Sequence, residues 1–230
     1  MKYKHLFFDL DHTLWDFETA SHQTWKSLYE SHQLSSRGIP DFEDFFRVYS
    51  GYNDIMWAQF RAGELTREEL RWKRIWKALL DFNIYDTPLS KNLSEAYLEL
   101  LPTQAYLMPY AREVLDYCKE KYKLHLITNG FEKTQKLKLE HAGINRHFLE
   151  MFSSERCDSM KPQAEIFRFA LNTVNADCSE CLMIGDALDV DIIGAMNVGI
   201  DTVYFNPARV HHNKKPSYEI AHLKDLLNIL

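Results

Sequence analysis

The chain contains five short apolar runs, and the first stands far from the other four. It occupies Lys4–Asp9, and the others follow only after residue 102, at Lys123–Thr128, Met151–Ser154, Cys181–Gly185 and Thr202–Phe205. Such runs, alternating with amphipathic helical patterns, are typical of buried parallel strands. The sequence therefore predicts an α/β fold, with a parallel sheet covered by helices on both faces.

Residues 16–101 show helical patterns and no convincing strand, so we expect an all-helical insert after the first strand. Thr66 and Glu69 have the spacing of a capping box at a helix start. The division that follows is a discontinuous α/β core of residues 1–15 and 102–230, with residues 16–101 as a second module. Five tryptophans lie in this stretch or directly before it. We interpret them mainly as the core of the helical module, with a few lining a substrate pocket as the alternative. They are Trp15, Trp25, Trp57, Trp72 and Trp76.

Composition excludes several classes of protein. With 27 basic and 33 acidic residues the net charge is −6, and no basic stripe is present, so we expect no nucleic-acid polymer as partner. No apolar stretch approaches the length of about 20 residues that a membrane span needs, and the N-terminal run is too short for a secretory signal. We therefore expect a cytoplasmic protein without a membrane partner, present as a monomer or weak homodimer.

Polar side chains stand where three of the predicted strands end. Asp9 and Asp11 follow the first strand, Thr128 and Asn129 the second, and Asp186 follows the strand at 181–185. In open parallel sheets, ligands bind beyond the carboxyl ends of the strands. We therefore expect these side chains to lie close together and to form the functional site.

Carboxylates that converge raise one another's pKa, and a divalent cation removes that cost. Mg²⁺ binds few carboxylates together with waters and phosphate oxygens. We expect Asp9 and Asp186 to share the ion, with a backbone carbonyl near Asp11 as a further ligand. The hydroxyl and amide after the second strand, together with Lys161, would hold a phosphate dianion. This pattern indicates phosphoryl transfer.

Four short motifs at predicted strand ends or helix starts follow one another along the chain. They are Asp9-x-Asp11-x-Thr13, Thr128-Asn129-Gly130, Lys161-Pro162 and Gly185-Asp186-x-x-x-x-Asp191. In this order they resemble the four motifs of the haloacid dehalogenase superfamily, and the match covers essentially the whole core. The resemblance implies a Rossmann-like core and identifies the helical insert as similar to a C1-type cap.

The resemblance implies roles for the residues that meet the substrate. Asp9 attacks phosphorus and forms an aspartyl-phosphate, which splits one difficult displacement into two. Asp11 protonates the leaving alkoxide and then deprotonates the hydrolytic water. Thr128, Asn129 and Lys161 bind the phosphoryl oxygens, and Lys161 also compensates the charge on Asp9.

The remaining motif residues are implied to hold and support the metal. Mg²⁺ is bound by Asp9, Asp11 and Asp186. Asp191 orients the waters of the metal or Lys161, and Thr13 ties the loop after the first strand.

The second acid of the first motif separates the reactions of the superfamily. A dehalogenase needs neither a proton donor nor a metal, so Asp11 and the acids Asp186 and Asp191 argue against it. Phosphomutases keep both acids of the first motif, so a phosphomutase stays open, as does a sugar-phosphate phosphatase. A non-catalytic module that binds phosphorylated metabolites is the alternative from another class, although it would be expected to lose Asp9 or Asp11.

A closer resemblance concerns the substrate. Trp57, Gly63-Glu64-Leu65, Ile127 to Phe131 and the run from Met183 to Pro207 are similar to YjjG-type bacterial 5'-nucleotidases. We therefore expect a Mg²⁺-dependent phosphatase whose partner is a small phosphorylated metabolite, a nucleoside 5'-monophosphate.

Overall fold

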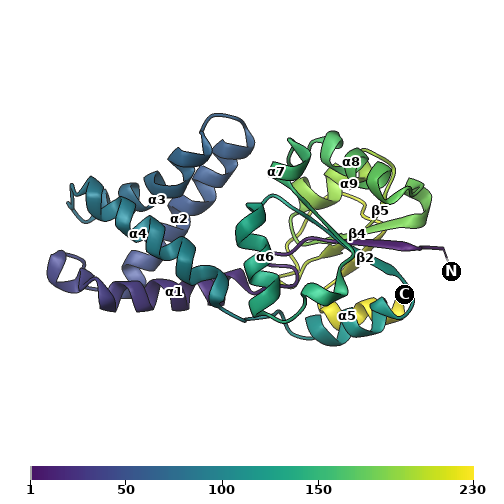
Figure 1. Ribbon diagram of the computed structural model, residues 1–230, viewed down its shortest axis with the longest axis horizontal. Coiled ribbons are helices and arrows are strands. Elements are labelled where there is room, and N and C mark those ends of the chain that lie inside the picture. The colour runs from purple at the N-terminus through teal and green to yellow at the C-terminus, as the bar shows by residue number, and fades with distance from the viewer. Residues whose placement is uncertain (1) are drawn as a thin grey trace. The chain divides into compact units, whose positions relative to one another are not determined.

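The computed structural model describes residues 2–230, which form two compact units (Figure 1). One unit combines residues 2–17 with Ala105–Leu230, and the other is Glu18–Gln104. The first unit carries the sheet, and the second consists of helices.

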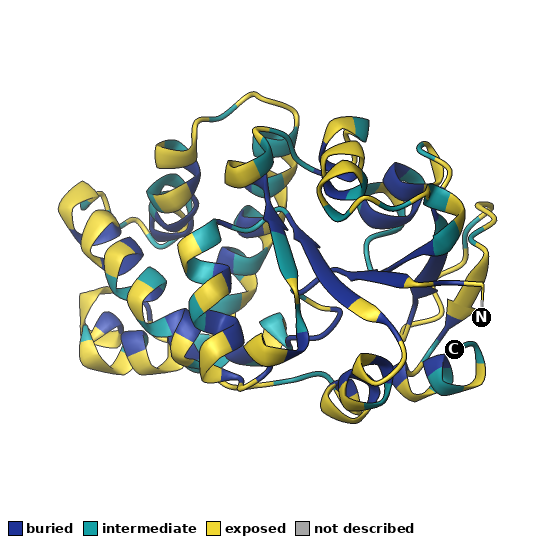
Figure 2. Ribbon diagram, turned by 45° about the vertical axis from the view of Figure 1, so that its right-hand side comes forward, coloured by how far each residue is buried: buried dark blue, intermediate teal, exposed yellow. Residues whose placement is uncertain are grey.

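The sheet has six strands, and every neighbouring pair is parallel. The strand order is β3-β2-β1-β4-β5-β6. The strands are β1 (His5–Phe8), β2 (Lys123–Thr128), β3 (Glu150–Ser153), β4 (Cys181–Gly185), β5 (Asp201–Phe205) and β6 (Tyr218–Ile220). All residues of β1 and β4 are buried, and Figure 2 shows the middle of the sheet in dark blue. The predicted α/β fold with a parallel sheet is thus confirmed, with a Rossmann-like arrangement.

Helices cover both faces of this sheet. α8 and α9 lie on one face, and α5 with the C-terminal helix η6 lies on the other (Figure 1). Between β1, the neighbouring strands and α8, apolar side chains such as Phe7, Phe152 and Phe167 form a buried cluster. The helices of this unit are α5 (Ala111–Lys119), α6 (Glu132–His141), η3 (Asn145–His147), α7 (Ser154–Cys157), α8 (Ala164–Val174), η4 (Cys178–Glu180), η5 (Leu188–Ile192), α9 (Ile193–Met196) and η6 (Leu223–Asn228).

Three elements of this unit add to what the sequence indicated. The edge strand β6 was not predicted, because it has three residues and only Ile220 is buried. The helical segment after β4 begins with the π-helical turn η5 and continues directly as α9. The segment at the C-terminus forms a 3₁₀-helix, η6, that packs beside α5.

The helical unit contains α1 (Phe17–Ser31), η1 (Leu34–Arg37), α2 (Phe42–Arg61), α3 (Arg67–Asp81), α4 (Thr87–Leu100) and η2 (Leu101–Thr103). The capping box predicted from Thr66 and Glu69 is present. Trp25 is fully buried, with its ring centre 5.0 Å from that of Tyr97, and forms part of the core of this unit. The sequence-based interpretation of the tryptophans holds for Trp25. Trp57, Trp72 and Trp76 are partly exposed. Trp15 is fully buried but belongs to the unit that carries the sheet, so it is not part of the core of the helical unit.

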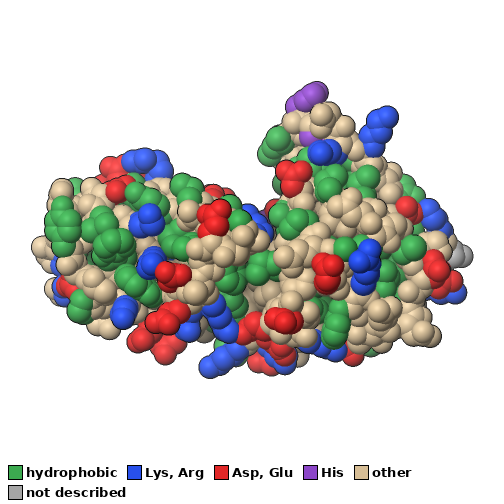
Figure 3. Space-filling model, turned by 90° about the horizontal axis from the view of Figure 1, so that it is seen from above, with side chains coloured by type: hydrophobic (Ala, Val, Ile, Leu, Met, Phe, Trp, Pro, Cys, Tyr) green, Lys and Arg blue, Asp and Glu red, His purple; other side chains and the backbone are tan. Residues whose placement is uncertain are grey.

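The surface carries charges of both signs. On the face drawn in Figure 3, acidic and basic side chains are interspersed, so the charge there is locally balanced. None of the helices within residues 2–230 has the length and apolar content of a membrane span.

Candidate active site

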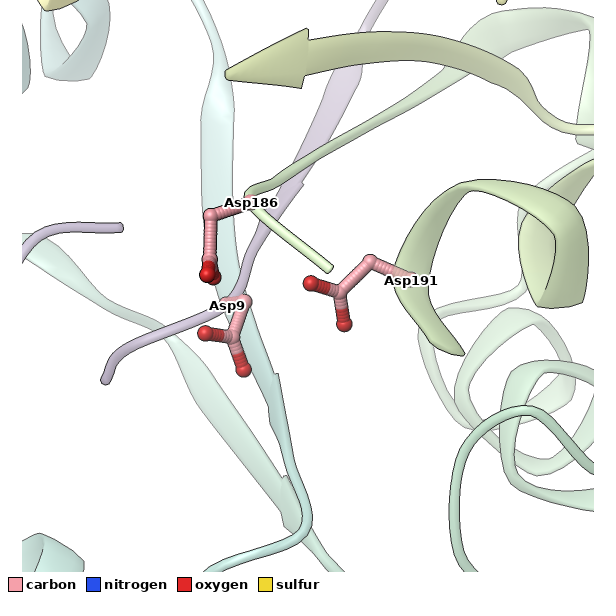
Figure 4. Close-up of side chains that lie close together, drawn as sticks. All are labelled: Asp9, Asp186 and Asp191. Carbon is pink, nitrogen blue, oxygen red and sulfur yellow. The ribbon is translucent and has the colours of Figure 1, made fainter. Parts of the chain in front are cut away.

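Three carboxylates meet at the carboxyl ends of β1 and β4 (Figure 4). Asp9 directly follows β1, Asp186 directly follows β4, and Asp191 lies in the turn η5. One oxygen atom from each residue lies within 4.8 Å of the other two. Asp9 and Asp191 are buried, and Asp186 is partly buried. The ends of two adjacent parallel strands thus concentrate negative charge at one point, as the sequence predicted for Asp9 and Asp186.

Lys161 supplies the positive charge beside this cluster. Its ammonium lies 2.5 Å from Asp9 Oδ1 and 2.6 Å from Asp191 Oδ1, and it donates a hydrogen bond of 2.7 Å to the carbonyl of Ile127. Only 2% of the lysine side chain is exposed. Burial would lower the pKa of Lys161, but the charges of Asp191 and Asp9 outweigh it and raise that pKa above its ordinary value. The lysine therefore remains charged.

The carboxylates are only partly neutralised. Burial raises the pKa of Asp9 well above its ordinary value, and the charges of Asp191 and Asp186 add to this against the opposing charge of Lys161. Burial and then the charge of Asp191 raise the pKa of Asp186 to about 6. One lysine faces three carboxylates, so an excess of negative charge remains. Hard oxygen donors with excess negative charge suit a divalent cation such as Mg²⁺.

Three hydrogen bonds hold the acids of the last motif in place. Thr13 donates a hydrogen bond of 3.0 Å to Asp186 Oδ1 and accepts one of 3.1 Å from the backbone N–H of Asp186. The backbone N–H of Ala187 donates to Asp191 Oδ2 at 3.0 Å. A Cβ atom at Gly185 would lie 2.4 Å from that same oxygen, so the close approach of Asp191 requires glycine.

The last residue of β2, Thr128, carries a hydroxyl whose hydrogen is not donated to another group in the described residues. Thr128 Oγ1 accepts hydrogen bonds from the backbone N–H of Gly130 at 3.1 Å and from Gln135 Nε2 at 2.7 Å. Within residues 2–230, no group accepts the hydrogen of this hydroxyl. Thr128 is thus able to donate to an anion.

The side chain of Asn129 is bonded to the backbone of Lys161, and its binding to phosphate stays a prediction. Its Nδ2 donates to the carbonyl of Lys161 at 2.9 Å, and its Oδ1 accepts from the backbone N–H of Lys161 at 2.8 Å. Because both ends of the amide are bonded to one backbone segment, the side chain fixes the loop that carries Lys161.

Asp11 lies outside the carboxylate cluster, whose third member is Asp191. Its carboxylate accepts hydrogen bonds from Lys138 and Gln135, so the side chain is not one of the clustered acids. Metal binding at Asp11 through a nearby backbone carbonyl stays a prediction. Burial would raise the pKa of Asp11, but the charge of Lys138 and the hydrogen bonds of Lys138 and Gln135 outweigh it and lower that pKa below its ordinary value.

Gln135 and Lys138 were missed by the sequence analysis. Both lie on α6 and both are buried. Their spacing of three residues places them on one helical face, and this is the only signal the sequence carries. It does not distinguish a buried polar face from a solvated one.

Comparisons with known proteins agree with this geometry. The sequence model of the family described as haloacid dehalogenase-like hydrolase matches residues 3–199. Pyrimidine 5'-nucleotidase PynA of Streptococcus pneumoniae is 31% identical, with 100% of this chain and 96% of PynA covered. Pyrimidine 5'-nucleotidase YjjG of Escherichia coli is 29% identical, with coverage of 100% and 99%.

The fold of this chain is also similar to that of a solved structure. The crystal structure of the HAD-hydrolase YfnB from Bacillus subtilis, bound to magnesium, matches with a TM-score of 0.90 and 28% identity. The match covers 100% of this chain and 99% of YfnB. Together with the parallel sheet and the acids at its strand ends, these matches show that the chain belongs to the haloacid dehalogenase-like hydrolases.

Proposed function

We propose that this protein is a Mg²⁺-dependent phosphatase that hydrolyses a small phosphomonoester through an aspartyl-phosphate on Asp9. The observation that carries the proposal is the arrangement around Asp9. This buried carboxylate is paired with Lys161 and lies in a cluster of acids suited to a divalent cation. Asp11, two residues further on, supplies a separate carboxyl group outside that cluster.

The chemistry divides into two displacements at phosphorus. An oxygen of Asp9 attacks, and the bond between phosphorus and the leaving alkoxide breaks. The negative phosphate beside Asp11 opposes the lowering of its pKa by Lys138, so Asp11 takes up a proton when the substrate binds and gives that proton to the alkoxide. Water then attacks the phosphorus of the aspartyl-phosphate, and Asp11 takes the proton of that water. The bond between phosphorus and Asp9 breaks, which releases inorganic phosphate and regenerates both carboxyl groups.

Thr128 and Lys161 would hold the phosphoryl group. Thr128 has a hydrogen to donate, whereas the ammonium of Lys161 already has three oxygen neighbours. Lys161 therefore reaches a phosphoryl oxygen by exchanging one of these contacts. Formation of the aspartyl-phosphate removes the charge of Asp9, so the contact to Asp9 is the one we expect to be exchanged.

Asp9 and Asp186 would hold the Mg²⁺ ion, and Asp191 would lie beside it. When bound, the ion would neutralise these carboxylates and the oxygens of the phosphate. Support comes from the excess of negative charge in the cluster and from the magnesium in the structure of the similar YfnB protein.

For the substrate we propose a nucleoside 5'-monophosphate. PynA and YjjG, which are similar to this chain over its full length, are both pyrimidine 5'-nucleotidases, and they support this choice. The resemblance noted in the sequence points in the same direction.

Phosphate release from a panel of nucleotides, sugar phosphates and other phosphomonoesters, with and without Mg²⁺, tests the proposal. We expect release that depends on Mg²⁺, favours nucleoside 5'-monophosphates and disappears in Asp9→Asn. Equal turnover of sugar phosphates would contradict the nucleotide assignment. The absence of any release would contradict the phosphatase assignment.

A further inference from the structure

We propose that Lys138 and Gln135 are positioning residues that fix the carboxyl group of Asp11 in the direction required for proton transfer. The inference rests on the proposed phosphatase function. It adds a role for α6, whose side chains none of the sequence motifs includes.

Two donors hold the carboxyl group of Asp11, one on each oxygen. Lys138 Nζ lies 2.5 Å from Oδ1, and Gln135 Nε2 lies 2.8 Å from Oδ2. Contacts at both oxygens fix the rotation of the carboxyl plane. Each carboxylate oxygen has two lone pairs, so one lone pair on each remains for the proton that Asp11 transfers.

Two aromatic rings also contact the ammonium of Lys138. Its ammonium lies 4.3 Å from the ring centre of Trp15 and 5.6 Å from that of Phe17. Trp15 is fully buried, and only 4% of the Lys138 side chain is exposed. Cation–π attraction strengthens when the cation loses its water, so these rings limit where the ammonium can point. The carboxylate that faces it is Asp11.

Gln135 connects Asp11 to the phosphate-facing hydroxyl. The same nitrogen that donates to Asp11 also donates to Thr128 Oγ1, at 2.7 Å. A Cβ atom at position 130 would lie 2.4 Å from Gln135 Nε2, so the side-chain amide of Gln135 can take this position only because residue 130 is glycine. One side chain therefore sets the distance between the proton donor and a phosphate ligand, which is the relationship that proton transfer to the leaving group requires.

Substrates with different leaving groups can show whether Lys138 and Gln135 position Asp11 or only stabilise the fold. An alkyl phosphate needs a proton on its leaving oxygen, whereas the nitrophenolate of p-nitrophenyl phosphate departs without one. For both substrates kcat/KM reports the steps up to formation of the aspartyl-phosphate. A variant with a misplaced Asp11 should therefore lose kcat/KM selectively for the alkyl substrate.

The experiment compares wild type, Lys138→Met and Lys138→Arg on a nucleoside monophosphate and on p-nitrophenyl phosphate, in the presence of Mg²⁺. We expect Lys138→Met to lose about 100-fold in kcat/KM on the nucleotide, within the range typical of general acid catalysis, and only a few-fold on the aryl phosphate. The nucleotide loss should lie mainly in kcat, and Lys138→Arg should recover most of it. Lys133→Met, on an exposed position of the same helix, serves as the control and should match wild type.

Equal losses on both substrates, or no loss on either, would overturn the inference while leaving the phosphatase assignment intact. An inactive wild type would instead overturn the proposed function and this inference with it. If methionine prevents folding, as judged by thermal unfolding, Lys138→Gln provides a second neutral variant. The same selective loss is expected for it.

Discussion

Lys161 Nζ lies 2.5 Å from Asp9 Oδ1, although the two residues are 152 positions apart in the sequence. The contact joins the end of β1 to the segment before α8, and it lies beside Asp191, whose Oδ1 is 2.6 Å from the same ammonium. Because all three side chains are buried, the stability of the site depends on their charges being balanced.

Removing the lysine should therefore affect both folding and activity. Lys161→Met leaves two buried carboxylates without their cation, and we expect the free energy of unfolding to fall by about 3–5 kcal/mol. Denaturation by urea without Mg²⁺ measures this change. Adding Asp191→Asn removes one of the two unpaired buried charges, so the double variant should regain part of the lost free energy of unfolding. A single variant as stable as wild type would contradict this charge balance.

The carboxylate of Asp186 should lower the stability of the metal-free protein and should be needed for the stabilisation that Mg²⁺ binding causes. Its pKa is raised to about 6, so its ionised form at pH 7 is unfavourable in the folded state by up to about 3 kcal/mol. We expect Asp186→Asn to raise the Tm of the metal-free protein and to abolish the further rise that Mg²⁺ causes in wild type. Asp189→Asn, at a neighbouring exposed position, is the matched control and should change neither value. A Mg²⁺ response that persists in Asp186→Asn would exclude Asp186 as a metal ligand.

A buried histidine pair should make stability depend on pH. His5 Nδ1 lies 3.1 Å from His125 Nε2 between β1 and β2. Burial, and then the neighbouring His5, lowers the pKa of His125 to about 4 from 6.5. The unfolded histidine takes up a proton first, so the stability that His125 contributes is complete above pH 6.5 and is lost as the pH falls towards 4. The expected loss is about 3 kcal/mol.

Urea unfolding at pH 7.5 and pH 4.5 measures this dependence. His125→Leu should reduce the difference in unfolding free energy between the two pH values. His141→Leu, at an exposed position, should leave it as in wild type. An unchanged difference in His125→Leu would show that the pair does not titrate as described.

The sequence predicted the parts of the fold and site that depend on local pattern. The runs that became β1, β2 and β4 are almost entirely buried, so their apolar residues identify them, and Asp9 and Asp186 follow from the strand ends. What it did not predict depends on burial and on distant partners. Nothing near Lys138 in the sequence shows that its ammonium lies under Trp15 and beside Asp11.

The side chain of Asn129 illustrates the same limit. Its amide is chemically suited to bind phosphate, but its partner is the backbone of Lys161, 32 positions away. Only the folded chain shows this contact. The motif therefore identified Asn129 as a residue of the site, and the structure showed that its side chain binds the backbone of Lys161.

The central claim is that Asp9 carries the phosphoryl group, and trapping that intermediate tests it most directly. Asp11→Asn mixed with p-nitrophenyl phosphate and Mg²⁺ can form the aspartyl-phosphate without proton donation, but it lacks the base that hydrolyses it. Acid quenching followed by peptide mass spectrometry should then find one phosphoryl group on the peptide that contains Asp9, and none when Asp9→Asn is added. A phosphoryl group on another residue, or none on any peptide while nitrophenol is released, would contradict the account.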